Sequence, residues 1–304
     1  MSELLILTPT YNRPESLVRT ARSLITEPNT FMAAIDQNPE RPTEQHLKSN
    51  AQDVLNHPQF DYLFSQIRGE ANARNFGIEY FKERLKEDSL FVCIDDDITV
   101  PRGWSSQVRD LAAKYPEVGI FSGAVEQGFE PEEGGIIPVF NPKEATQIIE
   151  LDEFHLGGMT AHMIIRPWVF DQIGTFDPKL GSGSHFGAAD DIDILYRALK
   201  ENIPVMAVQN PSVFHYGVRR NEEVRELYNR YTYALGAIMG KYLQNGEWNT
   251  VLLASEFSSH LRRAARSLVT TGRPTGIGSS LNLAKGIFDG LRTPAETSTR
   301  IFRS

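Results

Sequence analysis

The stretch Leu90-Phe91-Val92-Cys93-Ile94-Asp95-Asp96-Asp97 holds five apolar residues followed at once by three carboxylates. A short apolar run of this kind predicts a buried strand, which places the acids at its carboxyl end. Adjacent carboxylates repel one another, and a divalent cation with oxygen ligands, such as Mg²⁺ or Mn²⁺, would remove that cost. The stretch therefore favours a site for metal and phosphate over a solvated acidic turn.

Strand and helix patterns alternate along the chain as far as residue 218. This alternation predicts an α/β fold with a mostly parallel, Rossmann-type sheet that carries helices on both faces. Ligands bind such sheets outside the carboxyl ends of the strands, where Thr8, Asp36 and Asp95–Asp97 are expected. The predicted strands cover residues 3–8, 31–36, 62–67, 90–94, 118–122, 163–165, 205–208 and a segment around 213–214; the predicted helices cover a segment after Pro14 and residues 72–85 and 191–201.

The C-terminal part of the chain differs from the rest in pattern and in charge. Residues 1–218 are expected to form one catalytic domain, and residues 219–304 a helical extension with helices over 222–271 and 281–291, a loop over 272–280 and a frayed end. This extension holds 13 Lys and Arg against 7 Asp and Glu, whereas the whole chain of 304 residues has a net charge of −8. Its basic stretch around Arg262, Arg263 and Arg266 either packs on the catalytic domain or on another subunit, or contacts an anionic membrane.

Composition narrows the classes of protein that fit. An acidic body with a basic tail does not suit a nucleic-acid binder. Cys93 is the only cysteine, so an intramolecular disulfide is excluded, and its apolar neighbours predict a buried thiol. The sequence shows neither a signal peptide nor about 18 consecutive apolar residues, which favours a cytoplasmic protein, soluble or peripheral at the inner face of the membrane.

Three further motifs carry candidate site residues. Asp190 and Asp191 begin a predicted helix, where carboxylates either cap the helix or act as a general base. His215 stands among aromatic residues and is either packed or a metal ligand. Arg74 pairs either with a diphosphate or with acidic neighbours. The chain has no Gly-x-Gly-x-x-Gly or Walker fingerprint, which argues against the usual NAD and ATP loops.

Several motifs together resemble family 2 glycosyltransferases with the GT-A fold. They are Leu7-Thr8-Pro9-Thr10-Tyr11-Asn12-Arg13, Asp36, Ala73-Arg74-Asn75-Phe76-Gly77, Asp95-Asp96-Asp97, the segment from Gly157-Gly158-Met159 to Phe176-Asp177, and Asp190-Asp191-Ile192-Asp193. They occur in the family's order and span about residues 3–218. The family's acidic pair usually begins with Glu, whereas this chain has the shorter Asp190.

The resemblance implies a role for each matching residue. Asp191 would be the catalytic base, with Asp190 beside it, and Gly157 and Gly158 would lie on the acceptor and donor-sugar side. Asp97 is the first choice for the metal ligand, Asp96 is the alternative, and His215 would be a further ligand of the metal. The nucleotide-sugar would be bound by Thr8, Pro9, Tyr11, Arg13, Asp36, Arg74, Asp95 and Asp96.

The resulting hypothesis is a metal-dependent inverting glycosyltransferase that uses Mn²⁺ or Mg²⁺. It would move a sugar from a nucleotide-sugar, with UDP the expected nucleotide, to a hydroxyl of a glycan or lipid-linked acceptor in surface-glycan or polysaccharide synthesis. A homo-oligomer is compatible with this reading. The alternatives are a sugar-nucleotidyltransferase and a non-catalytic nucleotide-sugar-binding protein. The glycine-rich segments 123–135 and 181–187 are expected to order over a bound donor.

Overall fold

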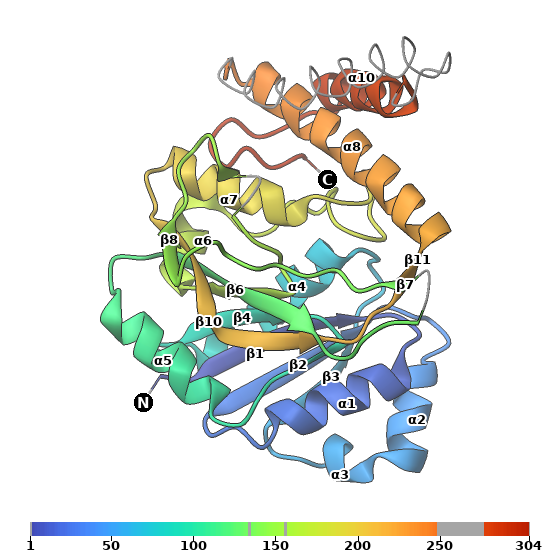
Figure 1. The fold of residues 1–304 in the computed structure, drawn as a ribbon, viewed down its shortest axis with the longest axis vertical. Helices are drawn as coiled ribbons and strands as arrows, with labels where there is room; N and C mark the ends of the chain where they lie inside the picture. The colour runs from blue at the N-terminus through green and yellow to red at the C-terminus, as the bar shows by residue number, and fades with distance from the viewer. Residues whose placement is uncertain (1, 133–134, 155–156, 248–276, 304) are drawn as a thin grey trace.

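The structure is a computed structural model that describes residues 2–132, 135–154, 157–247 and 277–303. One curved sheet forms the middle of the molecule, with helices on both faces and a pair of long helices at one end (Figure 1). The helices α1 (Pro14–Leu24), α2 (Pro42–Asn50), α3 (Gln52–Leu55) and α5 (Trp104–Lys114) cover one face; α4 (Glu70–Tyr80), α6 (Pro167–Ile173) and α7 (Asp190–Lys200) cover the other. The predicted α/β class is confirmed.

The strands follow the order β3-β2-β1-β4-β9-β6-β10-β5, and β8 pairs with β10. Strands β1, β2, β3, β4, β6 and β10 run in one direction, so their carboxyl ends meet at one edge of the sheet. Strand β9 runs the opposite way between β4 and β6. Their bounds are β1 Leu4–Thr10, β2 Thr30–Asp36, β3 Phe60–Phe64, β4 Leu90–Ile94, β5 Ile98–Thr99, β6 Ile120–Gln127, β8 Thr146–Ile148, β9 His162–Ile165 and β10 Val205–His215.

Burial on both faces explains why the central strands are continuously apolar. Along β1, Leu4 and Ile6 pack into the core against α1 and α5, whereas Leu5 and Leu7 pack into the core against α4 and α6. Alternate side chains of a strand point to opposite faces, so a strand covered on both sides needs apolar residues at every position. Cys93 is buried in the same way, as predicted.

Most predicted elements lie within a few residues of those observed, with three differences. Residues 120–127 form strand β6, so the first part of the segment predicted as a mobile lid is buried sheet. The two strands predicted at 205–208 and near 213–214 are one strand, β10, with an irregularity in its register. The predicted helix over 72–85 ends at Tyr80 and is followed by a short 3₁₀ turn, η1 (Lys82–Arg84).

The C-terminal part is helical as predicted, but its packing was not foreseen. Helix α8 (Asn221–Gln244) follows the short strand β11 (Arg219–Arg220), which pairs with β7 (Gly135–Ile136). Helix α10 (Ile277–Arg292) crosses α8 so closely that a Cβ on Gly286 would lie 2.0 Å from the carbonyl oxygen of Tyr233. The loop predicted over 272–280 is wrong for residues 277–280, which are helical; residues 248–276, with the basic stretch around Arg262, lie outside the described residues.

The chain end is docked rather than frayed. Phe302 is buried, and its backbone amide donates to Asp177 Oδ2 at 2.9 Å. Apolar packing against Phe186 accompanies this bond. The prediction of a frayed end missed this contact because the acidic partner lies 125 residues earlier in the chain.

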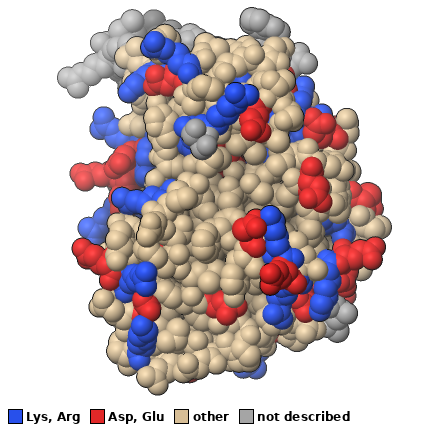
Figure 2. Space-filling model, turned by 180° about the vertical axis from the view of Figure 1, so that it is seen from behind, with Lys and Arg blue, Asp and Glu red and all other residues tan. Residues whose placement is uncertain are grey.

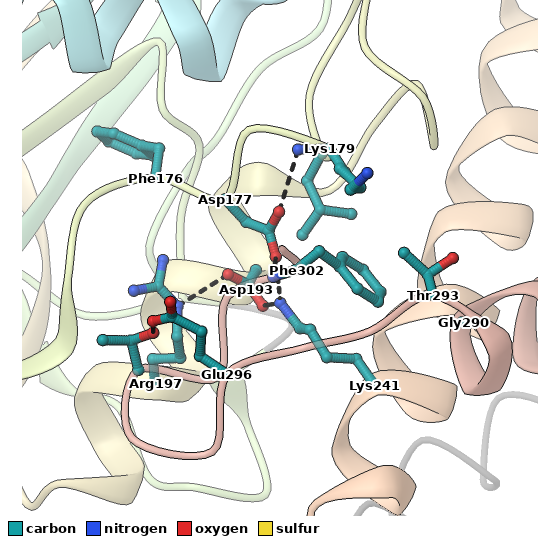
Figure 3. Close-up of polar contacts among 12 residues, drawn as sticks. Phe176, Asp177, Lys179, Asp193, Arg197, Lys241, Gly290, Thr293, Glu296 and Phe302 are labelled. Carbon is teal, nitrogen blue, oxygen red and sulfur yellow. Dashed lines mark hydrogen bonds and ion pairs between the residues drawn. The ribbon is translucent and has the colours of Figure 1, made fainter. Parts of the chain in front are cut away.

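A buried cluster of charged side chains ties α7, α8 and the chain end together (Figure 3). Lys241 of α8 forms ion pairs with Asp177, at 2.7 Å, and with Asp193 of α7. Arg197 Nε pairs with Asp193 Oδ2 at 2.8 Å, and the Tyr242 hydroxyl donates to Asp193 Oδ1 at 2.7 Å. The two cations balance the two anions, and all four charged side chains are fully buried, so helix α8 is fixed to the domain that carries the sheet.

None of the described helices is long and apolar enough to cross a membrane. On the face opposite to the view of Figure 1, acidic and basic side chains are interspersed around a largely uncharged centre (Figure 2).

Candidate active site

A cleft of about 360 Å³ opens at the edge where the carboxyl ends of the parallel strands meet. Its walls come from the segments after β1, β4 and β10, from the start of α7 and from α8. Polar and charged side chains from distant parts of the chain therefore share one cavity. Nine of the predicted site residues line it, namely Pro9, Tyr11, Arg13, Asp95, Asp96, Asp97, Asp190, Asp191 and His215.

The ends of β4 and β10 bring Asp97 and His215 together. Asp97 Oδ1 lies 3.1 Å from His215 Nε2, and Asp97 Oδ2 accepts a hydrogen bond from Arg13 Nη1 at 2.9 Å. Burial alone would raise the pKa of Asp97, but the hydrogen bond and charge of His215, with Arg13, outweigh it and the pKa lies below its usual value. A Cβ at position 217 would lie 2.3 Å from Asp97 Oδ2, so only Gly217 leaves room for this pair.

The ring of His215 is oriented by its other nitrogen. Nδ1 lies 2.8 Å from the carbonyl oxygen of Pro138, which can only accept, so Nδ1 carries a proton and Nε2 is the nitrogen directed at Asp97. Burial would lower the pKa of His215, but the hydrogen bond with Asp97 and its charge raise it. A carbonyl that fixes the tautomer in this way is the usual support of a metal-binding imidazole.

Asp96 occupies a different environment from Asp97. Its Oδ2 accepts a hydrogen bond from the Thr10 hydroxyl at 2.7 Å, and its Oδ1 lies 3.2 Å from Arg13 Nη1. Burial raises the pKa of Asp96 to about 7, although Arg13 opposes the shift. Adjacent acids of the triplet thus differ in charge state near neutral pH.

Arg74 of α4 joins the acidic triplet at the end of β4 to the start of α7. Its Nη2 donates to Asp95 Oδ1 at 2.9 Å and its Nη1 donates to Asp190 Oδ2 at 2.6 Å. The guanidinium is fully buried behind the cleft and does not line it. Of the two roles predicted for Arg74, pairing with acidic neighbours is the one seen here.

Asp191 is the carboxylate of the cleft without a cationic partner within ion-pair distance among its described neighbours. Its Oδ1 accepts the backbone amide of Ile192 at 2.8 Å, and no basic side chain of the described chain forms an ion pair with it. Burial raises the pKa of Asp191 to about 7, and the charge of Asp190 adds to the shift. The residue before the helix is Ala189, which cannot cap it with a side chain. A carboxylate poised in this way suits a general base at neutral pH.

Besides Arg74, four predicted residues lie beside the cleft rather than in its lining. Thr8 and Asp36 are fully buried in β1 and β2, and Asp36 accepts hydrogen bonds from Tyr62 and from the backbone of Asn38. Gly157 and Gly158 precede the lining residues Met159–Ala161. Gly158 sits at φ +144 with Ser122 where a side chain would be.

The cleft also contains residues that sequence reasoning did not select. Arg68 comes from the loop before α4 and stacks on Tyr11 at 4.6 Å, and Glu70 is the first residue of that helix. Arg219 follows β10 by four residues, and its Nε is buried without a hydrogen-bond partner in the described chain. The contribution of α8, from Leu227, Arg230 and Tyr231, carried no signal because its periodic pattern indicates only an amphipathic helix.

No group of three or more His, Cys, Asp or Glu among the described residues is arranged to hold a metal ion. Asp97 and His215 nevertheless supply one carboxylate oxygen and one imidazole nitrogen that lie 3.1 Å apart, with Asp95 and Asp96 in the same cleft. Mn²⁺ accepts such oxygen and nitrogen donors, whereas Mg²⁺ prefers oxygen alone and completes its shell with phosphate and water. The residues present therefore fit a divalent cation, provided that a bound diphosphate would supply the remaining ligands.

The strand order and the acidic cleft at its carboxyl edge define a GT-A fold, the class of nucleotide-sugar-dependent glycosyltransferases. The family model of glycosyl transferase family 2 matches residues 5–165, and the chain belongs to that family. No protein with a curated description matches the sequence.

Solved structures share the fold at low sequence identity. S. aureus TarS 1–349 in complex with UDP-GlcNAc is 13% identical at a TM-score of 0.59, with 95% of this chain and 81% of that chain covered. The mannosyltransferase PcManGT from Pyrobaculum calidifontis, in complex with GDP-Man and Mn²⁺, is 13% identical at a TM-score of 0.57, with 95% and 87% covered.

GalNAc-T7 with UDP, GalNAc and Mn²⁺ is 18% identical at a TM-score of 0.53, with 71% of this chain and 44% of that chain covered. In a further match to TarS 1–349, the chain spans 64% of that chain. These likenesses establish the fold alone.

Proposed function

We propose that the protein transfers a sugar from a nucleoside-diphosphate sugar to an acceptor hydroxyl, with inversion at the anomeric carbon. The observation that carries this proposal is that Asp191, a carboxylate with no ion pair to any described residue, lies in the same cleft as the Asp97–His215 pair. In the reaction, the acceptor oxygen forms a bond to the anomeric carbon as the bond to the diphosphate oxygen breaks. Asp191 takes the proton of the acceptor hydroxyl, and the nucleoside diphosphate leaves.

The residues of the cleft divide between donor and acceptor. Asp97 and His215 would hold a divalent cation, with Asp96 as the alternative carboxylate. When bound, that cation offsets the charge that develops on the leaving diphosphate. The buried Arg74 holds Asp95 and Asp190 in place through hydrogen bonds, on the proposed donor-sugar side. Gly157 and Gly158 would shape the adjoining wall. The nucleotide would be contacted by Pro9, Tyr11 and Arg13, which line the cleft, whereas the predicted Thr8 and Asp36 lie buried beside it.

The donor is proposed to be a UDP-sugar. Two of the similar structures contain UDP or UDP-GlcNAc, one contains GDP-Man, and two contain Mn²⁺. The His215 nitrogen favours Mn²⁺ over Mg²⁺ as the cation. A glycan or lipid-linked acceptor in surface-glycan or polysaccharide synthesis fits this chemistry. Residues 1–218 are proposed as the catalytic domain and residues 219–304 as the helical extension, open to membrane contact or self-association.

A thermal-shift screen of UDP-, GDP- and dTDP-sugars with and without Mn²⁺ tests the donor, because a ligand selective for the native state raises its stability. Product analysis then tests the reaction, and transfer should release the nucleoside diphosphate. Pyrophosphate release would instead identify a nucleotidyltransferase. Binding without transfer or donor hydrolysis would identify a binding protein.

A further inference from the structure

Helix α8 forms the wall of the cleft that faces Asp191. Leu227, Arg230 and Tyr231 line the cavity, and their spacing of three and four residues places them on one face of the helix. The charge of Asp191 and burial raise the pKa of Tyr231 well above its usual value, which reflects how close the phenol lies to the proposed base. The extension therefore completes the side of the cleft where the acceptor hydroxyl must enter.

Among the described residues, two arginines of the cleft have neither an ion pair nor an aromatic partner, namely Arg219 and Arg230. Arg219 belongs to β11, just after His215, whereas Arg230 comes from α8. Arg13 is paired with Asp96 and Asp97, and Arg68 stacks on Tyr11. No ion pair joins Arg230 to any acidic side chain of the described chain. Its stem runs beside the loop before α7, since a Cβ at Gly187 would lie 3.7 Å from Arg230 Cδ. An unpaired guanidinium thus sits on the same side of the cavity as Asp191.

The donor does not account for this cation. Its diphosphate is already placed by the proposed metal site at Asp97 and His215, which also faces Arg13. The donor-sugar side is dominated by carboxylates, with Asp95 and Asp190 joined through Arg74. The planar fork of an arginine matches a carboxylate or a phosphate with two hydrogen bonds. The other substrate is therefore the one whose anion Arg230 can bind.

We propose that the acceptor is an anionic sugar, whose phosphate or carboxylate is bound by Arg230 while its ring packs on Tyr231 and its hydroxyl faces Asp191. This inference rests on the proposed function and names the substrate class of the same site. It assigns acceptor selection to α8, a helix outside the segment matched by the family model.

The test uses the full chain saturated with UDP and Mn²⁺, so that the diphosphate site is filled. Binding of glucose, glucose 6-phosphate and glucuronic acid is measured by titration calorimetry on the wild-type protein and on Arg230→Gln, Arg230→Lys and Arg225→Gln. Arg225 is an exposed arginine of the same helix that does not line the cleft, so its variant is the matched control. Melting temperatures without ligand verify that every variant is folded.

We expect at least one of the two anionic sugars to bind the wild-type protein about tenfold or more tightly than glucose. Arg230→Gln should abolish that preference, Arg230→Lys should keep part of it, and Arg225→Gln should leave it unchanged. The comparison of phosphate with carboxylate identifies which anion is used.

Equal affinity for glucose and both anionic sugars in the wild-type protein would overturn the inference, and so would an equal loss in the Arg225 and Arg230 variants. A failure of the proposed function would appear elsewhere, as an absence of UDP binding with Mn²⁺ and of UDP release from any UDP-sugar.

Discussion

Asp190 and Asp191 are neighbours in the chain, yet within the described residues only Asp190 has a cationic partner, because Arg74 Nη1 donates to its Oδ2 at 2.6 Å. Asp191 accepts only a backbone amide among the described contacts. The ion pair fixes Asp190 and favours its charged form, against the burial that raises its pKa. Burial raises the pKa of Asp191, and the charge of Asp190 adds to that shift, which makes Asp191 a stronger base. Two carboxylates at the start of one helix are thereby given different chemistry.

Replacing Asp191 by Asn should separate binding from transfer. The amide keeps the size of the side chain but cannot accept the acceptor proton, so kcat should fall by about 10²–10⁴-fold. UDP with Mn²⁺ should still raise the melting temperature as in the wild-type protein, since the diphosphate site is untouched. Turnover of Asp191→Asn near the wild-type rate would mean that another group is the base.

The rate of transfer should rise with pH through neutrality. Since burial raises the pKa of Asp191 to about 7, the base is protonated and inactive at lower pH and becomes competent above that value. A profile of kcat at saturating substrates should therefore climb about tenfold per pH unit below 7 and level off above it. Asp96 has a pKa raised to about 7 as well, so UDP affinity should be followed in parallel to separate donor binding from catalysis. A flat profile of kcat across that range would contradict the assignment.

Removal of the metal should abolish both donor binding and transfer. Chelation leaves Asp97 and His215 paired with each other, and the diphosphate then meets carboxylates without a bridging cation. Asp97→Ala and His215→Ala should each raise the Kd of UDP, measured with Mn²⁺ present, by about tenfold or more. His46→Ala, which lies on α2 outside the cleft, is the control. Full activity in EDTA would remove the metal from the mechanism.

Lys241→Met should strongly destabilise the protein. It leaves Asp193 paired with Arg197 alone and leaves Asp177 buried without a described cationic partner, and loss of one partner of a buried ion pair costs about 3–5 kcal/mol. Lys48→Met is the matched control, because Lys48 makes an exposed pair with Glu44 worth about 0.5 kcal/mol or less. Chemical denaturation measures both values. Similar free energies of unfolding for the two variants would show that the buried cluster contributes little.

The close crossing of α8 and α10 should make one glycine intolerant of a single methyl group. A Cβ at Gly286 would lie 2.0 Å from the carbonyl oxygen of Tyr233, so Gly286→Ala must push the helices apart and should cost about 1–3 kcal/mol. Gly278, in the same helix, has no described atom within 4 Å of a built Cβ, and Gly278→Ala should leave stability unchanged or raise it slightly. Equal melting temperatures for the two variants would contradict this packing.

The sheet and the positions of its polar ends could be predicted because they follow from local pattern. The apolar run at Leu90–Ile94 fixes a buried strand, and parallel strands bring Asp97 and His215 to one edge whatever the details of the loops. The predicted roles of these residues remain proposals. Their meeting in one cleft is observed.

The rest depended on contacts between segments far apart in the chain. The pattern of α8 indicates a helix with an apolar face, but it cannot say that Arg230 and Tyr231 meet the loop before α7. In the same way, the hydrogen bond from the Phe302 amide to Asp177 joins positions separated by 125 residues. The local pattern therefore predicted a frayed end where the structure has a docked one. The partner of Arg74 stayed open for a related reason, because the spacing of its motif does not show which acidic side chains surround it.

The anchoring of α8 bears on how the protein can be shortened for expression. A fragment trimmed to residues 5–165, the span matched by the family model, would lack α7 and with it both Asp190 and Asp191. A longer fragment ending at residue 218 would expose Asp193 and Asp177 without Lys241 and would leave one side of the cleft open to solvent. A shortened protein therefore has to retain helix α8 at least through Tyr242, whatever domain boundary the sequence suggests.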